Sequence, residues 1–283
     1  MKNKNKIRVI VLFVQYNQKQ YNYSYKLLIS ILNKFSDFDF FRLVIDNSIE
    51  DKNFVIDIDN GVLIGGDNSE REFSGWECGL RYVESNIKEY DLILFINEAF
   101  NVYGDAYINR YLRTAANRSL KFNAVAGPID KDEKNRTLRL YDFGFKRWLR
   151  TNMFFVPKAI MDKIGCIITL PDSEFDKFVS PNHHDFIENT NDYFLPSAPI
   201  NDQFKAKIIS WLTDLWHGKF EINDDSWDKF RMKYKAIINE AMFTKRIIES
   251  GSDIISYAPL IIIYMNKLKH KIKFMILKFK DKI

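Results

Sequence analysis

The fold is decided by two neighbouring stretches, Asp67-Asn-Ser-Glu-Arg-Glu-Phe-Ser-Gly-Trp76 and Leu92-Ile-Leu-Phe-Ile-Asn-Glu-Ala-Phe100. The first is polar, carries an arginine between two acids and leads directly into a predicted helix. The second is an apolar strand that stops at Asn97 and Glu98. A buried strand that ends in an amide and an acid places both side chains at the carboxyl edge of a parallel sheet, where open α/β folds bind ligands. The two stretches therefore predict an α/β protein with a polar ligand site.

Apolar runs and helical stripes alternate through the first half of the chain. Ile7–Val14 is a continuous apolar run rich in β-branched residues, which is typical of a strand buried on both faces. A helical pattern at Ser24–Asn33 and a second buried strand at Phe41–Ile45 follow it. The next helix is expected from Gly75 to about Glu89, ahead of a strand at Asp91–Ile96. This alternation predicts a parallel sheet with right-handed crossovers.

The same patterns predict further elements on both sides of this unit, with no internal repeat and no flexible linker between them. We therefore expect the sheet and the later helices to share one core. The strands are expected at Phe54–Ile58, Val62–Ile64, Ala124–Gly127 and Thr151–Val156, and the helices at Asp105–Asn117, Lys158–Ile164, Asp172–Val179, Gln203–Trp216 and Asp228–Ser250.

Composition indicates a globular protein. Of the 283 residues, 46% are hydrophobic and 15% aromatic, unlike a disordered chain. Cys78 and Cys166 are too few for a disulfide framework, so a reducing, cytoplasmic setting is expected. The apolar run after the basic start ends at Val14 without a cleavage site, which argues against a signal peptide. No run approaches the ~18 apolar residues that a membrane-spanning helix needs.

The positive charge is concentrated at the end of the chain. The net charge is +5, but 258–283 alone carries seven lysines and one acid, so the remainder sums to −1. A near-neutral body argues against nucleic-acid binding. Apolar residues in 261–283 recur at helical spacing with lysines between them, which predicts a basic amphipathic helix at an anionic membrane surface. The alternative is a helix docked on the body with its lysines outward.

Five short motifs, taken in order, carry a family resemblance. They are Tyr16-Asn17 after the first strand, Leu27-Leu-Ile-Ser-Ile31 in the first helix, Asp46-Asn-Ser48 after the second strand, Ser74-Gly-Trp-Glu-Cys-Gly-Leu80, and Asn97-Glu-Ala99. The set, spanning about Ile7–Gly165, resembles GT-A glycosyltransferases, particularly family-2-like and rhamnosyltransferase-like enzymes of bacterial surface polysaccharide synthesis. Each motif alone is weak, and the order gives the set its specificity.

The resemblance implies a fold, a domain plan and an activity. The expected fold is α/β of the GT-A, Rossmann-like type, a mostly parallel sheet flanked by helices with a helical C-terminal extension. A catalytic domain is expected at 1–220, with a donor half at about 1–128 and an acceptor half at about 129–220, and the extension at 221–283. The implied activity moves a sugar from a nucleotide-sugar donor to a polysaccharide or lipid-linked glycan, with inversion, at the inner face of the cytoplasmic membrane.

The resemblance also assigns residues to the donor. Asp46 and Asn47 would read the nucleotide, although Asp-Asn-Ser is ordinary turn chemistry as well. Arg71 would pair with a phosphate, although Arg71 and Glu72 also suit a charged surface turn before a helix capped by Ser74. The predicted donor-binding residues are Tyr16, Asn17, Asp46, Asn47, Asn68, Arg71, Glu72 and Asn97.

The expected metal motif is reduced. GT-A enzymes commonly carry Asp-x-Asp at the strand end, where this chain has only Glu98 between Asn97 and Ala99. One carboxylate can still bind Mg²⁺ or Mn²⁺ together with diphosphate oxygens and water. The alternative is a site without metal, in which Arg71 neutralises the diphosphate.

The second half supplies the remaining candidates. Inverting transfer needs a carboxylate to take the proton of the acceptor hydroxyl. Asp202, at the start of a predicted helix, is the predicted base, with an ordinary N-cap as the alternative and Asp172 and Asp185 as weaker candidates; Asp202 and Glu98 are the predicted catalytic pair. Glu240 is expected only as a structural ion-pair residue. The predicted acceptor-binding residues are Arg150, Thr151, Asn152 and His183.

Two other functions fit the same residues. A non-catalytic module that binds a sugar nucleotide or glycan would explain the weakened metal motif. An α/β nucleotidyltransferase would also need a nucleotide and a metal, but it would favour a glycine-rich phosphate loop after the first strand. Gln15–Tyr23 contains no glycine.

Overall fold

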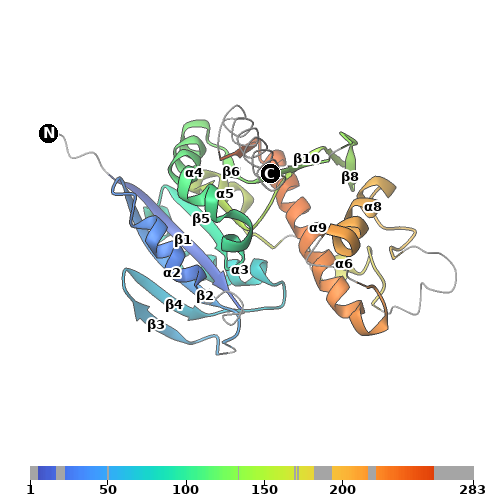
Figure 1. Cartoon of the computed structure of the whole chain (residues 1–283), viewed down its shortest axis with the longest axis horizontal. Helices are drawn as coiled ribbons and strands as arrows, with labels where there is room; N and C mark the ends of the chain where they lie inside the picture. Colours follow the sequence, from blue (N-terminus) through green and yellow to red (C-terminus); the bar gives the residue numbers. More distant parts are fainter. Residues whose placement is uncertain are drawn as a thin grey trace, which may run out of the picture.

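An eight-stranded sheet with helices on both faces forms the body of the protein (Figure 1). The computed structural model describes residues 6–16, 23–49, 51–132, 134–168, 170, 172–181, 193–215 and 221–257. The strand order is β12-β6-β11-β5-β1-β2-β4-β3. These strands are β1 (Ile7–Gln15), β2 (Phe38–Asp46), β3 (Val55–Ile58), β4 (Gly61–Gly65), β5 (Leu92–Asn97), β6 (Val125–Gly127), β11 (Met153–Pro157) and β12 (Ile254–Ser256).

The central strands run parallel, and their carboxyl ends are level with one another. β1 pairs with β2 so that Gln15 lies opposite Asp46, and with β5 so that Val14 lies opposite Asn97. β2 pairs with β4 so that Asp46 lies opposite Gly65. The α/β class and the mostly parallel sheet expected from the sequence are therefore confirmed, and the polar strand ends meet at one edge.

Two strands run against this direction. β11 lies antiparallel between β5 and β6, and β3 lies antiparallel to β4 at the end of the sheet. Met153, the first residue of β11, is opposite Ile96 near the end of β5. The segment Arg150–Asn152, which precedes β11, consequently lies at the same edge as Asn97.

Helices cover both faces because the strands are apolar on both. On one face α2 and α4 pack against Val9, Val11 and Phe13, and on the other α3, α5 and the end of α9 pack against Ile10 and Leu12. The helices are α2 (Ser24–Leu32), α3 (Glu72–Tyr82), α4 (Phe100–Phe122), α5 (Lys158–Ile164), α6 (Asp172–Phe175), α8 (Asp202–Ser210) and α9 (Trp227–Glu249).

The later helices have a hydrophobic cluster of their own. It combines α6, α8 and the first half of α9 with the short strands β8 (Leu138–Leu140), β9 (Phe143–Phe145) and β10 (Arg147–Leu149). β10 pairs with β7 (Ile129–Lys131). The second half of α9 packs on the sheet instead, through Phe243 and Ile247. The described residues thus form three clusters, one on each face of the sheet and one among the later helices, and α9 joins the last to one sheet face. Figure 1 shows α9 between the sheet and α8.

Several predicted boundaries are wrong. The helix expected from Gly75 to Glu89 begins at Glu72 and ends at Tyr82, and a separate 3₁₀ turn follows at Ile87–Glu89. The helix expected over Asp172–Val179 has only four residues, α6. The helix expected to reach Trp216 leaves regular geometry at Trp211, where a π-helical turn, Trp211–Leu215, begins. β12 was not predicted, because three residues give too short a pattern.

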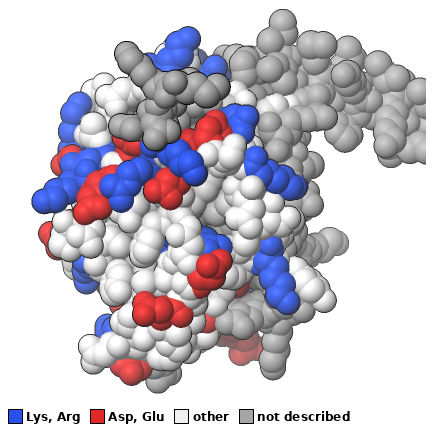
Figure 2. All heavy atoms as spheres, turned by 90° about the vertical axis from the view of Figure 1, so that its left-hand side faces the viewer, with Lys and Arg blue, Asp and Glu red and all other residues white. Residues whose placement is uncertain are grey.

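Charges on the described surface are mixed. On the described part of the face in Figure 2, basic and acidic side chains are interspersed. Ion pairs such as Arg8–Glu89 and Arg113–Asp37 are partly exposed. Within the described residues no helix is long and apolar enough to cross a bilayer. The predicted amphipathic tail at 261–283 lies outside the described residues.

Candidate active site

A cavity of about 310 Å³ opens at the carboxyl edge of the parallel strands. Its sheet side is formed by Glu72, Asn97, Ala99, Arg150, Thr151 and Asn152. The opposite side is formed by Trp211 and by Ala236, Ile237 and Glu240 of α9. The cavity therefore lies between the sheet and the cluster of the later helices, and it brings the predicted acceptor residues 150–152 together with two predicted donor residues, Glu72 and Asn97.

Glu240 is the most firmly held acid in the cavity. Its Oε1 accepts hydrogen bonds from the backbone N–H of Thr151 at 2.5 Å and from the Thr151 hydroxyl at 3.2 Å. One turn further along α9, the Thr244 hydroxyl accepts from the backbone N–H of Leu149 at 3.1 Å. These contacts fix α9 against the start of β11, so the Glu240 carboxyl group has a defined position.

Burial and neighbouring acids favour the neutral form of Glu240. Burial, together with the nearby acids Asp130 and Glu72, raises its pKa to about 8, while Arg150 and the Thr151 N–H oppose the shift. Burial also raises the pKa of Glu72 and of Asp130. Arg150 lies 3.7 Å from Asp130, from its Nε to the carboxylate Oδ2. The cavity thus holds a carboxyl group that exchanges its proton near neutral pH.

Two asparagines add polar groups to the sheet side. The backbone N–H of Asn97 donates to the carbonyl of Asn152 at 3.2 Å, and the Asn97 side-chain oxygen accepts from the N–H of Ala99 at the same distance. The side-chain oxygen of Asn152 is buried and has no hydrogen-bond partner among the described residues. A buried acceptor without a partner is costly, so a hydroxyl of a bound ligand would stabilise it.

A second, more polar pocket of about 600 Å³ lies at the ends of β2 and β4. It is bordered by Tyr16, Asn47, Ser48, Lys52, Asp67 and Asn68. Three of the predicted donor residues thus gather here, and Tyr16 is about half exposed. The two cavities lie at the same sheet edge, with β1 between the strand ends that form them.

The Asp46 carboxylate accepts three hydrogen bonds from neighbouring residues of the protein. Its Oδ2 accepts from the Gln15 amide at 2.8 Å, and its Oδ1 accepts from the N–H of Ser48 at 2.9 Å and from the Ser48 hydroxyl at 2.5 Å. Only 3% of Asp46 is exposed. The turn-capping role considered for Asp46 is therefore confirmed, and its role towards a nucleotide stays a prediction.

Asn47 ties the second pocket to the loop before α3. Its side-chain N–H donates to the carbonyl of Arg71 at 2.8 Å. A Cβ atom on Gly66 or Gly75 would stand only 2.2 or 2.6 Å from its side-chain oxygen, so a larger residue at either position would displace the Asn47 amide. The Gly75-Trp76 pair of the sequence motif is thus structural, and Trp76 is fully buried with its indole N–H directed at the carbonyls of Leu12 and Ile96.

Arg71 adopts a backbone conformation that favours glycine. Its φ is 54° and its ψ is −130°, and it directly precedes α3, so Arg71 and not Ser74 occupies the N-cap position. The Ser74 hydroxyl instead accepts from the N–H of Glu70 at 2.9 Å. The side chain of Arg71 lines a third cavity, which faces α9.

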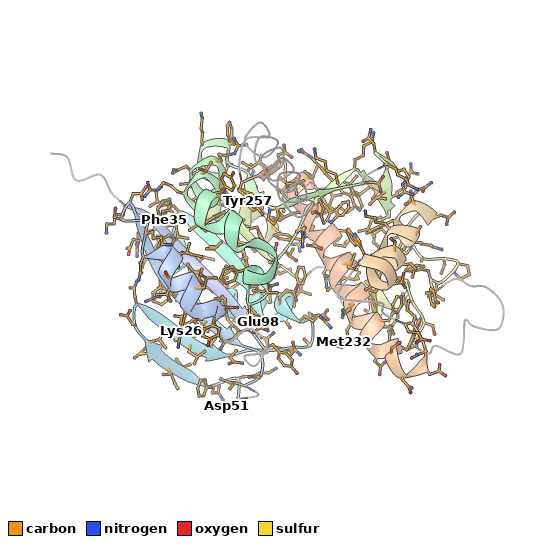
Figure 3. All side chains as sticks on the ribbon, in the orientation of Figure 1. Lys26, Phe35, Asp51, Glu98, Met232 and Tyr257 are labelled. Carbon is orange, nitrogen blue, oxygen red and sulfur yellow. The ribbon has the colours of Figure 1, made fainter. Side chains whose placement is uncertain are left out.

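Glu98 follows the last residue of β5. Its backbone N–H donates to the carbonyl of Val14 at 2.9 Å, and the hydroxyl of Ser24 donates to its carbonyl at 2.7 Å. Figure 3 shows Glu98 at the carboxyl edge, on the side turned toward Met232 of α9. Among the described residues, no three His, Cys, Asp or Glu side chains are grouped to hold a metal ion. A divalent metal at Glu98 would therefore have to share its coordination with the oxygens of a ligand.

The predicted base Asp202 lies apart from the cavity lining. It is exposed in the first turn of α8, and the N-cap role belongs to Asn201, whose side chain accepts from the N–H of Phe204 at 3.1 Å. Asp172 is the first residue of α6. The remaining predicted site residues, Asn17 and His183, and the weaker base candidate Asp185 lie outside the described residues.

Two cavity residues were not singled out as functional from the sequence. Glu240 was expected only as an ion-pair residue, and Trp211 only as part of an apolar helix face. A signal for Glu240 was available: it follows Ile237 by three residues and precedes Thr244 by four, so it lies on the inward stripe of α9. An acid on such a stripe must be hydrogen-bonded, protonated or paired with a ligand.

No protein-family model matches the chain, and no curated protein matches it in sequence.

Proposed function

We propose that this protein is a GT-A glycosyltransferase that moves a sugar from a nucleotide donor to a hydroxyl group of a glycan acceptor with inversion. The strand order and the polar strand ends support this reading, because both cavities lie where open α/β sheets bind ligands. The two cavities at one edge suit a reaction with two substrates.

The observation that carries the proposal is the position and protonation of Glu240. A general base works best when its pKa is close to the pH of the reaction, and the pKa of Glu240 is about 8. Glu240 takes the proton of the acceptor hydroxyl, the hydroxyl oxygen forms a bond to the anomeric carbon, and the nucleoside diphosphate leaves with the electrons of the broken bond. Arg150 and the Thr151 N–H stabilise the carboxylate form that starts the reaction.

The donor occupies the second pocket and the strand ends beside it. Asn47, Ser48 and Asn68 present amide, hydroxyl and backbone groups to a nucleoside, and Lys52, paired with Asp67 at 3.8 Å, adds an ammonium donor. The diphosphate then points along the edge toward Asn97 and Glu98. Glu98 would hold a Mg²⁺ or Mn²⁺ ion together with diphosphate oxygens, and such an ion would neutralise the charge of the leaving group.

The proposal is tested by donor turnover. Purified protein is incubated with UDP-, GDP- and dTDP-sugars, with Mg²⁺, with Mn²⁺ or with a chelator, and release of the nucleoside diphosphate is measured. Slow hydrolysis of one donor class is expected. If no donor is turned over, even with a glycan acceptor mixture present, the transferase proposal is wrong and a sugar-nucleotide-binding module remains.

The assignment of the base is tested by substitution. Glu240→Gln should lower transfer by about 10²- to 10⁴-fold and leave nucleoside diphosphate binding intact. Glu249→Gln is the matched control, because Glu249 lies on the same helix but is exposed and paired with Lys245. Wild-type transfer by Glu240→Gln together with loss of transfer in Asp202→Asn would move the base to Asp202.

The basic tail is proposed to hold the enzyme at an anionic membrane, as suits a lipid-linked acceptor. Truncation after Lys267 should release the protein from anionic vesicles but leave its donor hydrolysis unchanged. Equal vesicle binding by the truncated and the full chain would show that the lysines are not the anchor.

A further inference from the structure

The lining of the Glu240 cavity offers hydrogen-bond acceptors that have no donor. Glu240 uses its Oε1 for the Thr151 N–H and hydroxyl, and its Oε2 has no partner among the described residues. The buried side-chain oxygen of Asn152 has none either within the same part of the chain. Glu72 borders the cavity with a second carboxyl group. A ligand that fills this space should therefore bring N–H or O–H donors.

The cations near the cavity do not supply these donors. Of the described residues that line it, Arg150 alone is a cation, and its guanidinium is paired with Asp130 at 3.7 Å. Lys207 stands over the ring of Trp211, 5.3 Å from the centroid, and is not part of the lining. Arg71 borders the third cavity and not this one.

The two carboxyl groups on the lining lack an ion-pair partner among the described residues. Burial raises the pKa of Glu72, and the neighbouring Arg71 opposes this shift without cancelling it. The pKa of Glu240 is about 8, and Glu72 is one of the acids that raise it. A cation placed beside them would favour the ionised carboxylates that burial disfavours.

We propose that this cavity binds a ligand with a primary ammonium group next to a hydroxyl group, and that Glu72 and the Asn152 oxygen accept hydrogen bonds from the ammonium. An ammonium has three N–H donors and no acceptor, so it complements a lining with free acceptors. The identification of this ligand as the glycan acceptor, an amino sugar whose hydroxyl lies at Glu240, rests on the proposed function. The ammonium site itself does not.

Other substituents at this position fit the lining less well. A hydroxyl group can also pair with Asn152, but it brings a single donor and no charge, so the Glu72 carboxylate stays uncompensated. An N-acetyl group replaces the charge and two of the donors of the amine with a carbonyl acceptor. The lining therefore favours a free amine over a neutral sugar and over an acetylated one.

The test measures binding directly, without turnover. Calorimetry at constant ionic strength and near neutral pH compares glucosamine, glucose and N-acetylglucosamine as probes, and separately UDP, GDP and dTDP. Wild-type protein should bind glucosamine about tenfold or more tightly than either neutral sugar. Glu72→Gln should abolish this preference and leave binding of the nucleoside diphosphates unchanged.

Two further variants guard against misreading. Glu84→Gln is the matched control, because Glu84 follows the same helix, α3, but is exposed and lies outside the cavity. It should keep the full preference for glucosamine. Asn152→Ala removes the buried oxygen without breaking a hydrogen bond of that oxygen within the described residues, so it tests the site even if Glu72→Gln does not fold. It should weaken glucosamine binding by about tenfold.

The outcomes separate the proposals. Equal binding of glucosamine and glucose by the wild type, or an unchanged preference in Glu72→Gln and Asn152→Ala, overturns the ammonium site. An equal loss of glucosamine and nucleoside diphosphate binding in Glu72→Gln returns Glu72 to the donor, as the sequence predicted, and also overturns it. If no sugar nucleotide is turned over but glucosamine is preferred as expected, the transferase proposal fails and the ammonium site stands.

Discussion

The position and the pKa of the Glu240 carboxyl group depend on residues that are distant in the sequence. Its partner Thr151 lies 89 residues earlier, and the acids that raise its pKa, Glu72 and Asp130, come from two other segments. The helical stripe of α9 indicates that residue 240 faces inward, but no local pattern indicates what it faces. Trp76 is the opposite case, because its place on an apolar stripe was sufficient to predict its burial.

The raised pKa of Glu240 makes stability depend on pH. Because the folded state keeps a proton that the unfolded state loses above its ordinary pKa of 4.5, this contribution is present at low pH and is lost as pH rises toward 8. Urea unfolding at pH 5, 6, 7 and 8 should show wild type losing stability relative to Glu240→Gln, which mimics the protonated form. A constant difference across this range would contradict the buried, protonated state.

The strained backbone of Arg71 gives a second prediction. Arg71→Gly should raise the free energy of unfolding by about 1 kcal/mol, since a non-glycine residue at φ 54° and ψ −130° stores strain of that order. Asn135→Gly is the control, because Asn135 has a similar φ of 53° but asparagine tolerates the left-handed region. Its midpoint in urea should move less. A destabilised Arg71→Gly would mean that the side chain contributes more than the strain costs.

At the scale of elements, the sequence predicted whether the longer segments are helices or strands, but it did not predict where several of them begin and end. The continuous apolar run of β5 and the stripe of α9 gave both elements nearly complete from sequence. The start of α3 depends on the hydrogen bond between Asn47 and Arg71, which holds the turn before the helix. The spacing of apolar residues along the helix does not reveal that hydrogen bond, so it could not predict where the helix begins. The direction of β11 depends in the same way on its neighbours, because an apolar strand reads alike in both directions.

The π-helical turn after α8 leads to a prediction about binding. It begins at Trp211, which lines the cavity and packs edge-to-face on Trp148, with 5.1 Å between the ring centroids. A ring held in this way can stack on a sugar. Trp211→Ala should raise the acceptor KM by about two- to tenfold with little change in kcat, and Trp211→Phe should restore much of the affinity. A loss in kcat alone would show that Trp211 supports the cavity without contacting the acceptor.

At the scale of the whole molecule, α9 connects the hydrophobic cluster on one face of the sheet to the cluster of the later helices. Phe230 belongs to the cluster of the later helices and Phe243 to the sheet cluster, and both are fully buried. Because one helix carries both residues, unfolding of either cluster would break it. We expect a single thermal transition, with equal calorimetric and van't Hoff enthalpies.

Substitutions in the two halves of α9 test this coupling. Phe230→Ala and Phe243→Ala should each cost about 3–5 kcal/mol and should each shift the entire transition to lower temperature. Two resolved transitions, with each variant moving only one of them, would show that the clusters unfold independently.

The class of fold and the edge that carries the site were within reach of sequence reasoning, because both follow from where buried strands end. Asn97 was placed in this way and does line the cavity. The predicted acceptor residues 150–152 line it too, but they precede a strand and reach this edge because β11 runs antiparallel to β5. The sequence could not predict that the donor residues would line separate cavities. Their distribution depends on the side-chain direction of Arg71 and on how α9 packs.

The reversed direction of β11 has an evolutionary consequence. One wall of the Glu240 cavity is the short connection that enters this strand, Arg150–Asn152, and it is separate from the loops that leave the parallel strands. Descendants of this gene could exchange or lengthen that connection while the loops after β1, β2 and β5 stay intact. Under the proposed function, such swaps would change the acceptor and leave the donor pocket as it is.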